Sequence, residues 1–255
     1  MWDVPSRVTL NRRNKLGDGL SVLTGLEHFC SLFRPESKIT VCNVPVCHEL
    51  MDIFEFPHID YDESDENAEC LDEVLFTYCL VGEVREFWPA KFYTCLCVKA
   101  GIPVSSVRGI QMPVSKLGAW EDTGSQVACG QFDTRSGAPL EVYEIKRMLS
   151  VASFGKEVIL IGGPDTKPYM GDTMEYRCGN VLMLAKELLK SSHFIGADSG
   201  VGHLAGYLGV PLYIVNTCGY HSVYIFYRKY PHLHLIERDF IRGIMNSQPQ
   251  RGKTI

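Results

Sequence analysis

The chain has 255 residues, of which 45% are hydrophobic, and its formal net charge is −5. This hydrophobic content predicts a folded core, and the charge excludes the globally basic surface of a dedicated nucleic-acid binder. The ten cysteines do not form the pattern of a small disulfide-stabilised secreted domain. No apolar run is long enough for a signal peptide or for a membrane span of about 20 residues. We therefore expect a cytoplasmic protein with reduced thiols, located in the host cytoplasm if the source is a virus.

The first part of the chain predicts alternating strands and helices. A short strand and a polar turn precede a segment whose Leu and Phe residues recur at near-helical spacing. An acidic stretch at 60–73, with eight carboxylates and neither Lys nor Arg, is interpreted as a solvated loop. The predicted elements are a strand at 7–10, a helix from 18 to 33, a strand at 38–44, a short helix through 54, a strand at 75–80 and a helix at 87–100.

The second part repeats this alternation after a segment with little periodicity. That segment, 113–125, is rich in turn residues and is predicted to link two domains, 1–112 and 126–255. Strand and helix patterns then follow at 126–132, 140–154, 157–163, 181–191 and 194–215. Two such runs predict an α/β fold with two Rossmann-like halves that face each other across a cleft.

The segment 194–215 carries the strongest chemical signal. It reads as a buried strand, a tight Gly turn, a helix, a Gly-Val-Pro stop and a second buried strand. In an open parallel sheet, ligands bind at the edge where the first of these strands ends. A helix start with small residues also presents free N–H groups to an anion. The sequence therefore predicts a nucleotide-diphosphate site at this turn.

Three segments indicate a family. The run Asp198-Ser-Gly-Val-Gly-His-Leu-Ala205, with Leu208-Gly-Val-Pro211 behind it, resembles the signature of the bacterial heptosyltransferases, which have the GT-B fold. The Gly-Gly strand end at 158–164 and the run Leu16-Gly-Asp-Gly-Leu20 are similar to two further motifs of that family. The resemblance implies a shortened, ADP-heptose:lipopolysaccharide heptosyltransferase-like enzyme. Such an enzyme transfers a sugar from a nucleotide-diphosphate sugar to a hydroxyl acceptor, with inversion.

The resemblance also implies roles for single residues. The aspartate of the Gly-Asp motif acts as the base in this family, which points to Asp18, although the residue pattern alone suits an N-cap equally well. Asp198 is expected to orient the loop or to touch the donor sugar. His203 is expected to contact the phosphates, against the alternative of a core histidine with partners inside the protein. The diphosphate is assigned to the backbone N–H groups of Ser199, Gly200, Val201 and Gly202.

Further donor contacts are expected from the loop after the first strand of the second half. There the family uses a hydroxyl residue and a basic residue, for which Thr134 and Arg135 are the nearest candidates. Gly163 lies where the nucleoside is expected to rest. The family's usual small residues are replaced at 131–133, which is compatible with a different donor.

Neither a metal nor another cofactor is expected. The metal-like grouping of Cys42, Cys47 and His48 has no second Cys or His pair at zinc-site spacing. In the proposed scheme the turn and Arg135 supply the positive charge that faces the leaving group.

The acceptor is left open by the sequence. Arg12, Arg13 and Lys15 precede Asp18 and either attract an anionic acceptor or form a solvated turn. An aromatic cluster at 220–230 beside basic residues either stacks on nucleic acid or packs between the halves. The acceptor is therefore a lipopolysaccharide-type glycan or, alternatively, a hydroxymethylated DNA base of a virus. The sugar, the nucleotide and the oligomeric state are not specified.

Two rival functions remain at this point. One is a catalytically inactive module that binds a nucleotide or a nucleotide sugar. The other is a nicotinamide-dependent oxidoreductase, which is disfavoured because no Gly-x-Gly-x-x-Gly run follows a strand with an acidic residue about 20 positions later.

Overall fold

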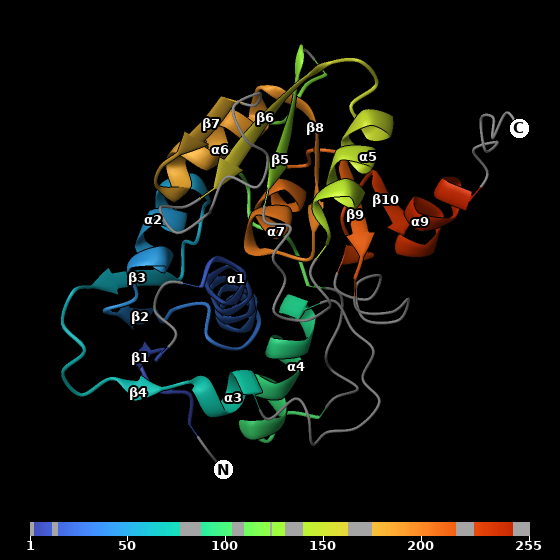
Figure 1. The fold of residues 1–255 in the computed structure, drawn as a ribbon. Helices are drawn as coiled ribbons and strands as arrows, with labels where there is room; N and C mark the ends of the chain where they lie inside the picture. Colours follow the sequence, from blue (N-terminus) through green and yellow to red (C-terminus); the bar gives the residue numbers. More distant parts are fainter. Residues whose placement is uncertain are drawn as a thin grey trace, which may run out of the picture.

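The computed structural model describes residues 3–11, 15–76, 88–103, 110–122, 124–130, 140–162, 175–217 and 227–246. Within these ranges the strands form two sheets, whose recorded pairings are all parallel (Figure 1). Helices accompany both sheets, so the predicted α/β class is confirmed.

The first sheet has the strand order β3-β2-β1-β4. Its helices follow the strands in chain order, and α1 is the longest of them. The strands are β1 (Arg7–Thr9), β2 (Ile39–Cys42), β3 (Ile59–Asp62) and β4 (Glu69–Cys70), and the helices are α1 (Leu16–Phe33), α2 (Pro45–Ile53), α3 (Asp72–Phe76) and α4 (Trp88–Lys99).

The second sheet has the strand order β10-β9-β8-β5-β6-β7. Numbered within this sheet, the order is that of a doubly wound Rossmann sheet, 3-2-1-4-5-6 when read from β7. The strands are β5 (Gln126–Gly130), β6 (Glu157–Gly162), β7 (Glu175–Cys178), β8 (Ser191–Ala197), β9 (Leu212–Asn216) and β10 (Leu233–Glu237), and the helices are α5 (Val142–Ala152), α6 (Val181–Leu189), α7 (Gly200–Tyr207) and α9 (Arg238–Asn246).

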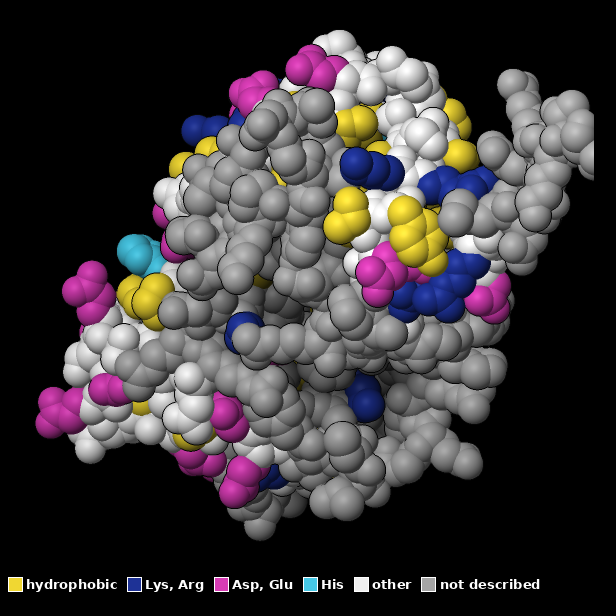
Figure 2. Space-filling view, in the orientation of Figure 1, with side chains coloured by type: hydrophobic (Ala, Val, Ile, Leu, Met, Phe, Trp, Pro, Cys, Tyr) yellow, Lys and Arg dark blue, Asp and Glu magenta, His cyan; other side chains and the backbone are white. Residues whose placement is uncertain are grey.

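Two predictions in the first half are wrong. The acidic stretch holds the strands β3 and β4, and the strand expected at 75–80 begins inside helix α3, with 77–80 outside the described residues. Both missed strands stand at the edges of their sheet. Edge strands carry charged side chains that reach water, so an apolar pattern is absent there. Asp and Glu side chains indeed gather on this part of the surface (Figure 2).

Helix α1 lies between the two sheets and joins their cores (Figure 1). It contacts α4, α2 and α7, and its buried positions run continuously from Gly19 to Leu26. Gly25 explains the close packing of α4, because a Cβ atom there would lie 2.4 Å from Cδ1 of Phe92. A helix buried on several faces is mostly apolar, and within this buried stretch only the small side chains of Ser21 and Thr24 are polar. None of the described helices is long and apolar enough to cross a membrane.

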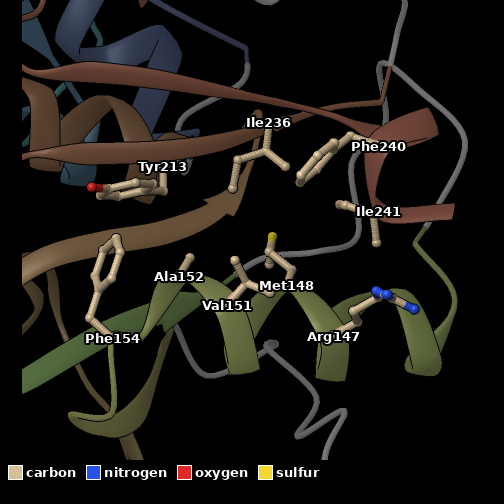
Figure 3. Close-up of a pocket in the computed structure, with 9 residues that line it drawn as sticks. All are labelled: Arg147, Met148, Val151, Ala152, Phe154, Tyr213, Ile236, Phe240 and Ile241. Atoms are coloured by element: carbon tan, nitrogen blue, oxygen red, sulfur yellow. The ribbon is translucent and has the colours of Figure 1, made fainter. Parts of the chain in front are cut away.

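The helices of the second half lie on opposite faces of its sheet. Side chains from α6 and α7 share one hydrophobic core with the first half, whereas α5 and α9 enclose a separate core on the other face. Successive strand residues point to opposite faces, so Phe194 belongs to the first core and Ile195 to the second. A small apolar pocket of about 140 Å³ opens between α5 and α9, where Met148, Phe240 and Ile241 point toward one another (Figure 3).

The separate core is anchored by a buried ion cluster. The fully buried Glu144 carboxylate of α5 accepts hydrogen bonds from Arg238 at 2.7 and 2.8 Å and from Arg242 at 2.8 Å. The Arg238 hydrogen bonds, with help from the Glu141 amide and Arg242, lower the pKa of Glu144 to about 2. Because the pKa is lowered in the folded state, the carboxylate stabilises the fold at pH values above its ordinary pKa of 4.5. This stabilisation is lost as the pH falls toward 2.

We expect Glu144→Gln to lower the free energy of unfolding at pH 7 by about 3 kcal/mol, because the neutral amide removes the charge that this pKa shift reports. Urea unfolding at pH 7 and at pH 3 checks this, with exposed Glu157→Gln as the matched control. The wild-type protein should lose more stability between the two pH values than the variant does. Equal losses would contradict the role of this cluster.

Candidate functional site

In both sheets the strand order reverses next to the first strand. Most of the predicted site residues come directly after strands that border these two reversals. In the first sheet the reversal lies between β1 and β4, and β1 leads into helix α1. In the second it lies between β5 and β8, and β8 leads into helix α7. Ligands of doubly wound sheets bind outside the carboxyl ends of the strands at such reversals. The strand orders of both sheets therefore place the candidate ligand site at the starts of α1 and α7.

Helix α1 begins at Leu16, and its N-cap is Lys15. Asp18 is consequently the third helical residue, so the alternative prediction that Asp18 is an N-cap is wrong. A carboxylate in the first turn is stabilised by the positive end of the helix dipole. Asp18 is partly exposed and Lys15 is exposed, so both side chains reach the surface at this end of the helix.

Helix α7 begins at Gly200, with Ser199 as its N-cap. The Ser199 hydroxyl accepts a hydrogen bond from the Gly202 amide at 3.1 Å, and the Ser199 amide donates to the Tyr227 hydroxyl at 3.0 Å. Two of the four backbone amides that the sequence assigned to the diphosphate, those of Ser199 and Gly202, thus donate their hydrogen bonds to protein groups instead. For the amides of Gly200 and Val201, no hydrogen-bond partner lies among the described residues.

The starts of the two helices touch each other. A Cβ atom on Gly200 would lie 2.9 Å from Cβ of Leu16 and 3.1 Å from the nitrogen of Gly17. A Cβ atom on Gly17 would lie 3.8 Å from Cα of Gly200 and 3.7 Å from Cδ2 of His203. Two positive helix ends therefore converge, with Asp18 in the first turn of one of them. Such an arrangement favours a bound anion more than a single helix terminus does.

Polar contacts between the halves support this convergence. Thr24 of α1 and Tyr207 of α7 share a buried hydrogen bond of 2.8 Å between their hydroxyl groups. The amide of Val181 at the start of α6 donates to the Glu49 carboxylate of α2 at 2.7 Å. The relative position of the two halves is thus fixed by specific hydrogen bonds as well as by apolar packing.

His203 has protein groups at both ring nitrogens. Its Nδ1 atom lies 2.9 Å from the Tyr230 hydroxyl, and its Nε2 atom lies 3.6 Å from an Asp198 carboxylate oxygen. The imidazole also stacks on the ring of Tyr227, with centroids 4.3 Å apart. This is the geometry of the alternative prediction, a histidine whose partners lie inside the protein. Direct contact of His203 with a phosphate remains a prediction.

The described part of the aromatic cluster packs against helix α7 of the second half, and packing between the two halves remains a prediction. Tyr227 and Tyr230 are buried, and both touch helix α7. Their role was missed because their partners, Gly202 and Gly206, precede them by about 25 residues. The four-residue spacing of these glycines was the available signal, since it places both on one face of a helix. Residues 220–226 of the cluster lie outside the described part of the chain.

A polar residue that the sequence did not single out also lies at the carboxyl edge of the second sheet, next to the end of β8. Asn216 ends β9, is buried, and donates a hydrogen bond to the Glu237 carboxylate at 3.3 Å. Its Oδ1 atom has no hydrogen-bond partner among the described residues. Buried acceptors are usually satisfied, so this oxygen is a candidate ligand contact.

Several predicted site residues lie outside the described ranges, namely Arg12, Arg13, Thr134, Arg135 and Gly163. At the suggested metal grouping, His48 stacks on Tyr61, and burial raises the pKa of the Cys47 thiol above its ordinary range. Across the described residues, no three His, Cys, Asp or Glu side chains gather in a way that could hold a metal ion.

Comparisons with known proteins agree with this architecture. The sequence matches no protein-family model and no curated protein with significance. Among solved structures, a glycosyl transferase of family 9 from Veillonella parvula matches with a TM-score of 0.60 at 14% identity, over 97% of this chain and 91% of that one.

Two further solved structures come from E. coli. The heptosyltransferase WaaC with ADP matches with a TM-score of 0.58 at 10% identity, over 94% of this chain and 99% of that one. The ADP-heptose lipopolysaccharide heptosyltransferase II matches with a TM-score of 0.53 at 11% identity, over 90% of each chain. The chain therefore has the GT-B fold of the bacterial heptosyltransferases, and the resemblance indicated by its motifs is confirmed at the level of the fold.

Proposed function

We propose that the protein is a glycosyltransferase that moves a sugar from a nucleoside-diphosphate sugar to a hydroxyl acceptor. The observation that carries this proposal is the contact between the starts of α1 and α7 at Gly17 and Gly200. This contact joins the N-terminal ends of two helices at the strand reversals of two Rossmann-like sheets, and Asp18 belongs to the first turn of one of these helices. The fold neighbours, one of which was solved with ADP, support the same class of donor.

In the proposed reaction, Asp18 removes the proton from the acceptor hydroxyl. The acceptor oxygen forms a bond to the anomeric carbon while the bond from that carbon to the diphosphate oxygen breaks, and the configuration inverts. The departing nucleoside diphosphate carries the electron pair away. General-base catalysis of this kind contributes about 10² to 10⁴ in rate.

The leaving group is the second part of the proposal. The amides of Gly200 and Val201 and the two helix ends stabilise its charge, and Arg135 adds a guanidinium from the loop after β5. Asn216 is positioned near this edge to accept a hydrogen bond from the donor. In this scheme the protein supplies the positive charge and no metal takes part.

The acceptor is proposed by class only. Lys15, Arg12 and Arg13 precede the base, so an anionic acceptor fits best, either a phosphorylated glycan of the lipopolysaccharide type or modified DNA. Transfer to hydroxymethylated DNA and to a lipid core, each measured at low salt, distinguishes the two.

The function is tested by incubating the protein with a panel of nucleoside-diphosphate sugars and measuring nucleoside diphosphate release. We expect release from at least one donor, and a raised melting temperature with the matching nucleoside diphosphate. Binding without release or transfer for every donor and acceptor would instead favour the inactive binding module. No binding of any nucleoside diphosphate would overturn the proposal.

A further inference from the structure

The rings of Tyr227 and Tyr230 occupy a face of helix α7 that glycines leave open. A Cβ atom on Gly202 would lie 2.8 Å from the Tyr227 hydroxyl oxygen. A Cβ atom on Gly206 would lie 2.4 Å from Cγ of Tyr230. These distances are too short for any side chain, so the two glycines are what allows the two rings to reach the helix backbone.

The Tyr227 hydroxyl contacts both backbone groups of one residue. It accepts a hydrogen bond from the Ser199 amide at 3.0 Å and donates one to the Ser199 carbonyl at 3.1 Å. Burial, with the Asp198 charge beside it, raises the pKa of Tyr227 well above its ordinary value, so the hydroxyl keeps its proton. Ser199 in turn caps α7 through its bond to the Gly202 amide. One side chain thus holds the residue that sets the shape of the turn.

The same two tyrosines hold the imidazole that follows the turn. The ring of Tyr227 stacks on the imidazole of His203 at an interplanar angle of 15°. The Tyr230 hydroxyl forms a hydrogen bond with the Nδ1 atom of His203. The Nε2 atom is left facing Asp198. The orientation of His203 is therefore fixed by Tyr227 and Tyr230 before any ligand arrives.

A turn that is fixed in advance binds more tightly than one that must be ordered. Ordering a loop on binding consumes part of the interaction free energy, and supporting hydrogen bonds remove that requirement. In this turn the amides of Ser199 and Gly202 donate the hydrogen bonds that hold the turn in shape. The amides of Gly200 and Val201 stand between them at the first positions of the helix.

We propose that Tyr227 is a positioning residue of this turn, which holds Ser199 so that the amides of Gly200 and Val201 are aimed at the diphosphate. The identity of the ligand rests on the proposed function. The hydrogen bonds that fix the turn do not, because they are properties of the protein alone.

The test compares wild-type protein with Tyr227→Phe, which keeps the ring and removes the hydroxyl. We expect ADP to bind about tenfold more weakly by calorimetry, since losing a buried hydrogen bond commonly has an effect of this size. The Ser199 amide should exchange its hydrogen about tenfold faster by the same argument. Tyr93→Phe, at a buried tyrosine of α4, is the matched control and should change neither quantity.

The outcomes separate the two proposals. If wild-type protein binds ADP, and Tyr227→Phe binds it equally well with unchanged exchange at Ser199, the role of Tyr227 is wrong and the proposed function stands. If wild-type protein binds none of ADP, GDP, UDP and CDP, the proposed function is wrong, and the exchange rate at Ser199 still decides whether Tyr227 holds the turn. Should Tyr227→Phe fail to fold, Gly202→Ala displaces the hydroxyl while keeping the tyrosine, and the same changes are expected.

Discussion

Replacing Asp18 with asparagine is expected to lower kcat for sugar transfer by about 10² to 10⁴, while ADP affinity changes by less than about threefold. The amide has nearly the shape of the carboxylate but does not accept a proton from the acceptor hydroxyl. Asp18 lies in the first turn of α1, one residue after the glycine that faces Gly200. In the proposed site the amides of α7 bind the diphosphate, and this binding does not need the charge of Asp18.

The measurement is a steady-state assay of transfer together with calorimetric titration of ADP. Asp52→Asn, on the exposed side of α2, is the matched control and should retain full activity. Undiminished transfer by Asp18→Asn would show that another group is the base. If wild-type protein and Asp18→Asn bind ADP equally and neither transfers sugar, the inactive binding module is the better description.

The second large effect is expected from Gly200→Val. A Cβ atom at this position would lie 2.9 Å from Cβ of Leu16 and 3.1 Å from the nitrogen of Gly17, and valine adds two methyl groups beyond it. The starts of α1 and α7 must then move apart. Because the convergence of these helix ends forms the proposed anion site, ADP should bind at least about 100-fold more weakly, and overpacking should destabilise the protein by about 1–3 kcal/mol.

The matched control for this change is Gly243→Val in α9. Among the described residues, no atom outside the adjoining backbone of α9 lies within 4 Å of a Cβ atom built on Gly243, whose φ angle is not positive, so valine fits there without displacement. Calorimetric titration of ADP and urea unfolding are measured for both variants. Unchanged ADP affinity in Gly200→Val, at whatever stability, would remove the helix convergence from the binding site.

The strand, turn and helix around Ser199 could be predicted from the sequence because their signals are local. A buried strand, the small residues at 199–202 and the Gly-Val-Pro stop at 209–211 all lie within one short segment. The observed elements β8, α7 and β9 follow that pattern closely. The position of Asp18 near the start of a helix could also be predicted. The N-cap could not, because it is Lys15, which makes no side-chain capping bond and is not a preferred N-cap residue.

Features that depend on distant partners could not be predicted. The strands β3 and β4 are acidic because they are sheet edges, and edge positions follow only from the strand order. The tyrosines at 227 and 230 support the turn from beyond β9, so their hydrogen bonds depend on how the chain returns to α7. Likewise, the contact of Gly17 with Gly200 joins the two halves, and it exists only once α1 is buried between the sheets.

The convergence of α1 and α7 on a diphosphate is tested most directly by a crystal structure of the protein with bound ADP. We predict that the diphosphate lies within hydrogen-bond distance of the Gly200 and Val201 nitrogens and on the side of the turn that faces Asp18. ADP bound at another place, or the starts of α1 and α7 found on surfaces that do not face each other, would contradict the proposed site.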